Sequence, residues 1–165
     1  MEEDDDAYVD KGISLDEIEH GTESFSYHES ILTWNKKGIW LIKSNEHEEA
    51  ISCFDEAIKL DPKISDSWYS KGFALHSLGK YEEAISCFNE AIRLEPEYTS
   101  AWGNKGNALD SLGKYEEAIA CYDEAIKLKP EYLVALYSKG DSLRKWGRDE
   151  EAEQCLVKSR ELQQC

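Results

Sequence analysis

Among the residue types that can bind metals or act in catalysis, cysteine has the most regular spacing in this sequence. Cys53, Cys87, Cys121 and Cys155 follow one another at intervals of 34 residues, and a fifth cysteine, Cys165, ends the sequence. Thiolates are good zinc ligands, so an evenly spaced series raises the question of a row of metal sites. The odd number of cysteines and the lack of a CxxC pair instead favour a reducing compartment, and we expect a cytoplasmic protein.

The other residue types that serve catalysis form no recognisable motif. The four histidines have no ligand spacing such as HxxxH, and the sequence has no Gly-rich phosphate loop and no GxSxG. The pairs Glu82-Glu83 and Glu116-Glu117 are again 34 residues apart, so they follow the same period as the cysteines. We therefore expect no enzyme, no cofactor and no metal site.

The period of 34 residues extends over most of the chain. Residues 65–98 and 99–132 are identical at 22 of 34 positions, including the stretch GKYEEAI that begins at Gly79 and again at Gly113. Residues 31–64 and 133–165 are weaker copies of the same unit. Self-similarity at such a period is the signature of a repeat protein.

Each unit has the pattern of two helices joined by a sharp turn. In the second unit, Trp68, Gly72 and Leu75 recur at helical spacing, and a second apolar stripe follows from Tyr81 to Leu94. One such helix pair cannot bury its apolar face alone, so successive pairs must stack on each other. The sequence therefore predicts an all-α solenoid.

Glycine and proline mark the turns of the two inner units. Gly79 can adopt the left-handed conformation that ends a helix, and Pro96 stops the second helix of the same unit. The first unit has Asn45 at the glycine position, and asparagine tolerates this conformation better than other residues with a side chain. Upstream, Ser26 followed by Glu29 predicts an early start for the first repeat helix.

The predicted stacking also decides the role of the cysteines. Equivalent residues of adjacent repeats lie about 10 Å apart, because that is the usual distance between packed helices. Four thiolates at this distance cannot share a zinc ion that binds sulfur at about 2.3 Å. Because all four cysteines lie beside the apolar stripe, we interpret them as small packing residues.

The residues that recur with the 34-residue period resemble the tetratricopeptide repeat (TPR) pattern. The second unit shows it as Trp68, Gly72, Tyr81, Ala84, Phe88, Ala91 and Pro96, and the third as Trp102, Gly106, Tyr115, Ala118, Tyr122, Ala125 and Pro130. The amino-acid sequence of these two units is similar to that of archaeal TPR proteins. The resemblance covers residues 31–165 and implies a right-handed α-solenoid of antiparallel helix pairs, with four TPR units at 31–64, 65–98, 99–132 and 133–165.

The two outer units depart from this pattern. Trp40 stands where alanine is usual, and His47 stands where tyrosine is usual. In the last unit, Glu153 replaces the isoleucine of the inner units, which fits a terminal helix with one solvated face. The non-recurring Trp40 and Trp146 either pack at the ends of the array or act as surface anchors. Weak self-association through exposed ends stays open as an alternative, and so does truncation from a longer array.

The resemblance further implies a binding groove on the concave side, lined by the first helix of each unit. Its aromatic side chains would offer rigid contact area, and its side-chain amides could pair with an extended peptide backbone. The candidate groove residues are Asn35, Tyr69, Phe73, Asn104, Asn107, Tyr137, Asp141 and Arg144. We expect a protein-interaction scaffold that holds a peptide or helix of another protein. A self-assembly module and a regulatory subunit of an enzyme on another chain remain the alternatives.

Some family members capture an acidic C-terminus with a clamp of lysine, arginine and asparagine side chains. The two registers in which this chain could form the clamp give Asn35, Ile39, Ser70, Ser100 and Asn104, or Tyr69, Phe73, Asn104, Val134 and Ser138. Neither set contains a cation. The resemblance therefore implies a ligand of another kind.

The formal charge of −16 is concentrated at the N-terminus. Residues 1–30 carry −10 and residues 31–165 carry −6, which disfavours binding to nucleic acid or to anionic lipid. The sequence has no stretch of about 20 apolar residues, so we expect no membrane span. Residues 1–30 form an acidic extension that is either partly disordered or docked on the array, with a short helix expected near Leu15–His20.

Overall fold

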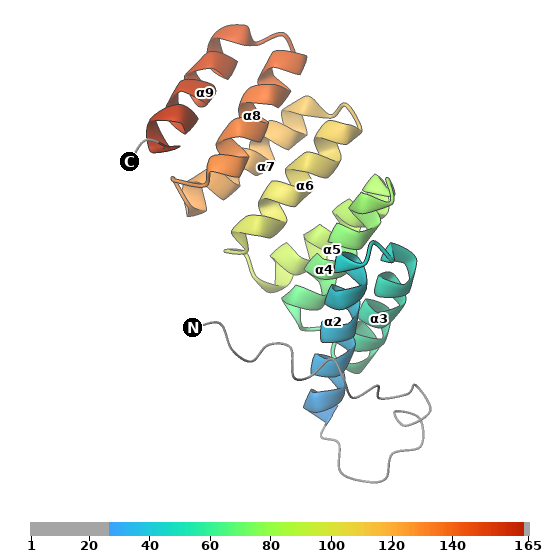
Figure 1. Ribbon diagram of the computed structural model, residues 1–165. Helices are drawn as coiled ribbons and strands as arrows, with labels where there is room; N and C mark the ends of the chain where they lie inside the picture. The colour runs from blue at the N-terminus through green and yellow to red at the C-terminus, as the bar shows by residue number, and fades with distance from the viewer. Residues whose placement is uncertain (1–26, 164–165) are drawn as a thin grey trace, which may run out of the picture.

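The computed structural model describes residues 27–163, and this part of the chain consists of eight α-helices without a strand (Figure 1). The helices form the pairs α2 (Tyr27–Lys43) and α3 (His47–Leu60), α4 (Ser65–Ser77) and α5 (Tyr81–Leu94), α6 (Thr99–Ser111) and α7 (Tyr115–Leu128), and α8 (Leu133–Lys145) and α9 (Asp149–Gln163). The all-α fold of four helix pairs is therefore confirmed. The helix expected near Leu15–His20 and the terminal Cys165 lie outside the described residues.

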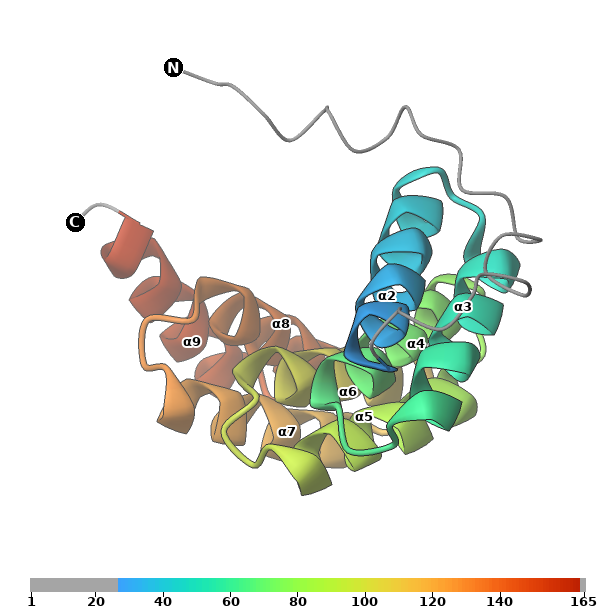
Figure 2. The ribbon, with the colours of Figure 1, turned by 90° about the horizontal axis from the view of Figure 1, so that it is seen from below.

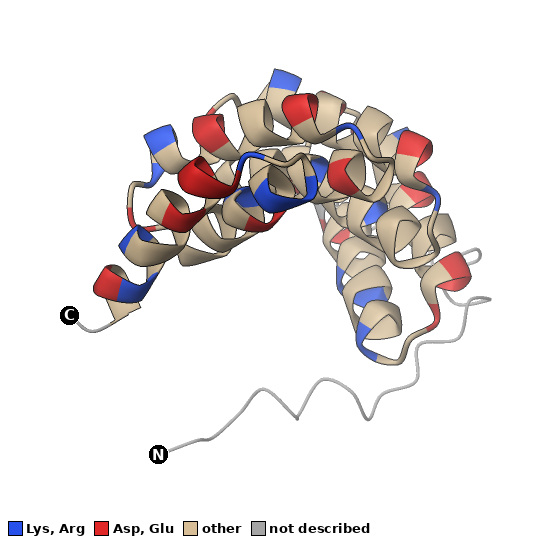
Figure 3. Ribbon diagram, turned by 90° about the horizontal axis from the view of Figure 1, so that it is seen from above, with Lys and Arg blue, Asp and Glu red and all other residues tan. Residues whose placement is uncertain are grey.

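The helix pairs stack into an arch. Each helix contacts the next one in the chain, and α2, α4, α6 and α8 also contact one another in series. Within residues 27–163 no such contact joins α3, α5, α7 and α9. The first helices of adjacent pairs thus contact one another, whereas the second helices of adjacent pairs do not. The layer of first helices is therefore the shorter one and forms the inner side of the curve (Figures 2 and 3).

The turn inside each pair has the predicted left-handed residue. The backbone angle φ is 63° at Asn45 and 75° at Gly79, and Gly113 and Gly147 have the same sign. At Gly79 the turn closes with two hydrogen bonds, from the Gly79 amide to the His76 carbonyl and from the Lys80 amide to the Leu75 carbonyl, both 2.9 Å long. These bonds satisfy carbonyls that a helix end otherwise leaves unpaired. The prediction at Asn45 is therefore confirmed.

A glycine in the first helix of each pair lets the second helix approach closely. A Cβ atom built on Gly106 would lie 2.5 Å from Cε1 of Tyr122, and one on Gly72 would lie 2.8 Å from the same atom of Phe88. Both rings are almost fully buried. The aromatic ring of the second helix therefore rests directly on the backbone of the first in the first three pairs, and Leu156 takes the place of the ring over Gly140 in the fourth.

The periodic tryptophans are half-buried rather than fully buried. The indole nitrogens of Trp68 and Trp102 donate to the carbonyls of Pro62 and Pro96 at 2.9 and 3.0 Å. Their rings pack against the buried core clusters. Their polar edge fixes the connector that leads into each new pair, because a partly buried indole N–H needs an acceptor.

The periodic cysteines pack as expected. Cys53, Cys87 and Cys121 are buried, and Cys155 is half-buried. Burial raises the pKa of the Cys87 thiol to about 11, which keeps it protonated at neutral pH. No group of His, Cys, Asp and Glu side chains within residues 27–163 is arranged to hold a metal ion.

The first helix begins earlier than the repeat boundary. Helix α2 starts at Tyr27, upstream of Ile31, as the sequence signal at Ser26 predicted. It is therefore longer at its N-terminal end than α4, α6 and α8.

None of the helices in the described part of the chain has an apolar stretch of the length that a membrane span requires.

Candidate functional site

The first helices of the pairs present the candidate residues on the inner layer of the arch. Two of them are aromatic side chains that reach solvent, Phe73 on α4 and Tyr137 on α8, with exposed fractions of 37% and 63%. Helix geometry explains the exposure, because these positions lie on a face that neither the second helix nor the adjacent pairs cover. Both side chains are therefore available to a ligand without a rearrangement of the core.

Three further candidates are joined in a ladder of hydrogen bonds that crosses two repeats. The amide nitrogen of Asn104 donates to the Tyr69 hydroxyl at 2.9 Å, and that of Asn107 donates to Oδ1 of Asn104 at 3.4 Å. The Tyr122 hydroxyl, which comes from the core, donates to Oδ1 of Asn107 at 2.8 Å. Each amide keeps one N–H and further acceptor capacity, so the ladder could still pair with a peptide backbone.

Tyr69 has a structural role in addition to its place in the ladder. Its ring centroid lies 4.9 Å from that of Tyr98 and 6.0 Å from that of Phe88, and burial raises the pKa of its hydroxyl. Tyr98 in turn donates from its hydroxyl to Asp66 at 2.7 Å, which joins the connector after α5 back to α4. Tyr69 therefore forms part of the wall between repeats two and three rather than an exposed anchor.

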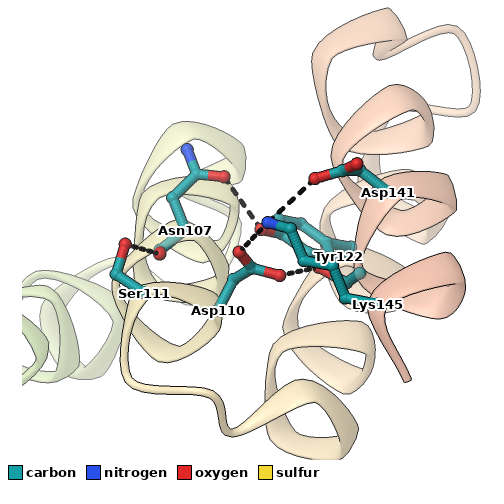
Figure 4. Close-up of polar contacts among 7 residues, drawn as sticks. Asn107, Asp110, Ser111, Tyr122, Asp141 and Lys145 are labelled. Carbon is teal, nitrogen blue, oxygen red and sulfur yellow. Dashed lines mark hydrogen bonds and ion pairs between the residues drawn. The ribbon is translucent and has the colours of Figure 1, made fainter.

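A charged cluster lies beside the ladder, between α6 and α8 (Figure 4). Asp110 accepts a hydrogen bond from the Ser142 hydroxyl and one from Nζ of Lys145, the latter at 2.6 Å. Lys145 also lies 2.9 Å from a carboxylate oxygen of Asp141. These two carboxylates raise the pKa of Lys145, with the hydrogen bond to Asp110 as the larger cause. Asp141 is one of the predicted groove residues, whereas its connection through Lys145 to Asp110 on the neighbouring repeat was not predicted.

The remaining polar candidates differ in how far they are engaged. Asn35 accepts a hydrogen bond from the Ser67 hydroxyl at 3.0 Å, so it joins repeats one and two. Asp141 is held by Lys145. The guanidinium of Arg144 is exposed and makes no hydrogen bond or ion pair with any residue in the range 27–163. Arg144 is therefore the candidate cation that a ligand could reach at lowest cost.

Several aliphatic side chains extend the apolar part of the inner layer beyond the eight candidates. Leu32 and Ile39 on α2 and Val134 on α8 are all exposed by 45% or more. They stand at the inner-layer positions of their repeats, so the periodic pattern could have found them. The structure thus has apolar side chains on both arms of the arch and a polar ladder between them.

Stacked helix pairs with a curved inner layer define this protein as an α-solenoid of short helical repeats. Family models described as tetratricopeptide repeat match residues 31–64, 65–98, 99–132 and 133–164, which is most of the chain. The chain belongs to the tetratricopeptide repeat family. A comparison with curated proteins gave no match.

Solved structures support the same fold. A crystal structure of MamA has a TM-score of 0.78 and 26% identity, over 81% of this chain and 78% of that one. The second TPR domain of human RPAP3, in complex with the HSP70 peptide SGPTIEEVD, has a TM-score of 0.69 and 26% identity, over 71% and 98%. The first TPR of Spaghetti (RPAP3), bound to the HSP90 peptide SRMEEVD, has a TM-score of 0.65 and 26% identity, over 78% and 94%.

Proposed function

We propose that the chain is a protein-interaction module that binds an extended peptide segment or a short helix of another protein on the inner side of the arch. Two structural neighbours are TPR domains with peptides bound, and repeat arrays of this kind expose extended concave surfaces for binding. The observation that carries the proposal is the pairing of exposed aromatic side chains, Phe73 and Tyr137, with a central ladder of amides.

The chemistry of the inner layer indicates the kind of segment. Apolar side chains of the ligand would contact Phe73 on one arm and Tyr137 on the other, and burying such aromatic anchors provides most of the energy of many interfaces. Between them, Asn104 and Asn107 would pair with the ligand backbone. Arg144, which stands outside the clamp positions, would favour a single acidic side chain of the ligand near that end.

The ligand we propose differs from the acidic tails bound by the RPAP3 domains. The clamp positions of this chain carry no lysine or arginine, and Asn104, which both registers share, already donates to Tyr69. A carboxylate placed there would meet no positive partner. The peptides SGPTIEEVD and SRMEEVD are therefore suitable negative probes, and we expect no measurable binding of either one.

The experiment that tests the proposal is selection from a displayed peptide library, followed by affinity measurement for the selected peptide by fluorescence anisotropy. The test variant is Phe73→Ala combined with Tyr137→Ala. Both side chains are exposed, so their removal should leave the fold intact. Truncation of an aromatic anchor typically costs 1 kcal/mol or more, so we expect Kd to rise by about tenfold or more.

A matched control separates the inner layer from the rest of the surface. Val157→Ala on α9 removes an exposed apolar side chain of similar accessibility, 39%. The selected peptide should bind this variant as it binds the wild type. If Phe73→Ala/Tyr137→Ala also leaves Kd unchanged, the inner layer is not the binding surface. Tyr69→Ala and Asn107→Ala are unsuitable as tests, because both side chains hold adjacent helices together.

The two alternative functions make different demands on the same surfaces. A regulatory subunit would use the same inner layer, and only the identity of the partner would differ. Self-assembly by stacking of ends would use the outer face of α9, where the charged and amide side chains of Glu150, Glu153, Gln154, Lys158 and Glu161 surround the exposed Val157. Within that face an ion pair of 2.5 Å joins Arg160 to Glu153. This polarity favours peptide binding over stacking at the C-terminal end.

A further inference from the structure

The N-terminal end of the array has an exposed face that is buried in every other repeat. Trp40 of α2 is 52% exposed, whereas the residues at the same repeat position, Ala74, Ala108 and Ser142, are at most 1% exposed. Those three are covered by the preceding repeat, to which their helices pack. In the described part of the chain no helix precedes α2. A large indole therefore stands at a position where this fold normally has a covered, small side chain.

Three lysines lie within four residues of Trp40 on α2, and the acidic Glu29 of this helix lies further away, in its first turn. The positions that face the preceding repeat are identified by their contacts, such as Lys71 to Asp55 at 2.6 Å and Lys139 to Asp123 at 2.5 Å. On α2 the same face carries Lys36, Lys37, Trp40 and Lys43. Lys37 lies over the ring of Trp34 at 5.5 Å, so it is held close to the helix. The face thus combines one exposed aromatic ring with three lysines.

Residues 1–26 have the complementary composition and lead directly into α2. They contain ten acidic residues and one lysine, for a formal charge of −9, together with the apolar residues Tyr8, Val9, Ile13, Leu15, Ile18 and Phe25. Opposite charge of this size favours contact with the lysine-bearing face over contact with the acidic remainder of the array. The apolar residues could cover the indole ring.

The length of this segment is also sufficient. Between the inner repeats, the preceding helix and its connector run from Tyr81 to Tyr98 before α6 begins. Residues 1–26 exceed that length. Trp40 lies thirteen residues after Tyr27, which is about 20 Å along the helix at 1.5 Å per residue. A segment that turns back at Tyr27 can therefore reach it in either helical or extended form.

We propose that residues 1–26 fold back along α2 and cover the face that carries Trp40, closing the N-terminal end of the array. This contact takes the place of the preceding repeat and leaves the inner layer open. It is independent of the peptide-binding function, and it assigns the acidic extension a structural partner on its own chain. Trp40 acts as the anchor, and the lysines select the acidic segment.

The test is hydrogen–deuterium exchange, read by mass spectrometry, on the full chain. The reference is a synthetic peptide of residues 1–26 under the same conditions. We expect slower exchange of the amides in residues 1–26 of the protein than in the free peptide. Trp40→Ala should abolish this protection without unfolding α2, because the residue is exposed and alanine is found at its position in two other repeats. Trp146→Ala, at the other end of the array, should leave it unchanged.

A second variant addresses the charges alone. Lys36→Glu combined with Lys43→Glu should also remove the protection, and high salt should weaken it in the wild type, because the screening length falls to about 3 Å at 1 M. Exchange equal to that of the free peptide would overturn the proposal, and so would protection that survives Trp40→Ala. Protection that appears only at high protein concentration, with a dimeric mass by light scattering, would assign the face to a second copy and equally overturn it.

Discussion

Replacing Gly106 by alanine sets two physical effects against each other. In a helix interior, alanine is more stable than glycine by about 0.5–1 kcal/mol, because glycine loses more backbone freedom on folding. The added Cβ, however, would lie 2.5, 2.8 and 2.9 Å from three ring carbons of Tyr122. That ring is 1% exposed, and its hydroxyl is bound to Asn107, so it has no room to withdraw.

The packing term should be the larger of the two. Overfilling a well-packed core costs about 1–3 kcal/mol. After the helix gain is subtracted, we expect Gly106→Ala to lower the free energy of unfolding by about 0.5–2 kcal/mol. Urea unfolding followed by circular dichroism measures this difference, and the midpoint should fall while the slope is unchanged.

A double-mutant cycle identifies the cause of the loss. In a Tyr122→Ala background the ring is gone, so Gly106→Ala should become stabilising by about 0.5–1 kcal/mol. Because Tyr122→Ala alone costs several kcal/mol, the cycle is best measured with an osmolyte present. Gly106→Ala that is neutral or stabilising in the wild-type background would refute the reasoning. The same holds if its effect does not change sign when the ring is removed.

Two further predictions concern buried polar groups. Tyr122→Phe gives repeat three the phenylalanine that repeat two has at Phe88, and it removes the hydrogen bond to Asn107. Urea unfolding should show a free energy of unfolding lower by about 0.5–1.5 kcal/mol. An unchanged free energy of unfolding would exclude a stabilising role for that hydrogen bond. Burial lowers the pKa of His76 from its ordinary value of 6.5. Below that pH the folded state therefore binds fewer protons than the unfolded state. The stability that neutral His76 provides is lost as the pH falls below 6.5. His76→Gln should therefore show a smaller loss between pH 7.5 and pH 5.5, and an equal loss in both proteins would contradict this cause.

The fold could be predicted from the sequence because its signals are local and repeated. The period gave the helix pairs, and the left-handed turn was correctly predicted even at Asn45, where glycine is absent. Family resemblance gave the inner-layer positions. The exposed state of Phe73 and Tyr137 is consistent with that assignment, although their role in binding stays a prediction.

The polar contacts between repeats could not be predicted in the same way. Asn104 and Asn107 were assigned to a ligand backbone, but each also bonds to a neighbouring side chain. Whether an amide faces solvent or a tyrosine on a neighbouring helix depends on how two helices, of one repeat or of adjacent repeats, are rotated against each other. That rotation is set by the packing of whole helices, and no short sequence window contains it. The ion pairs that join Lys145 to Asp110 and Asp141 could not be predicted for the same reason.

Contacts limited to neighbouring helices have a consequence for how the array loses its structure. Since α2 has no direct contact with α6 or any later helix, opening one end removes support only from the adjacent pair. The chain should fray from its ends, and its local stability should form a gradient that peaks in repeats two and three. Those repeats contain the amide ladder. The centre of the inner layer should therefore keep its structure while the outer repeats on either side open locally.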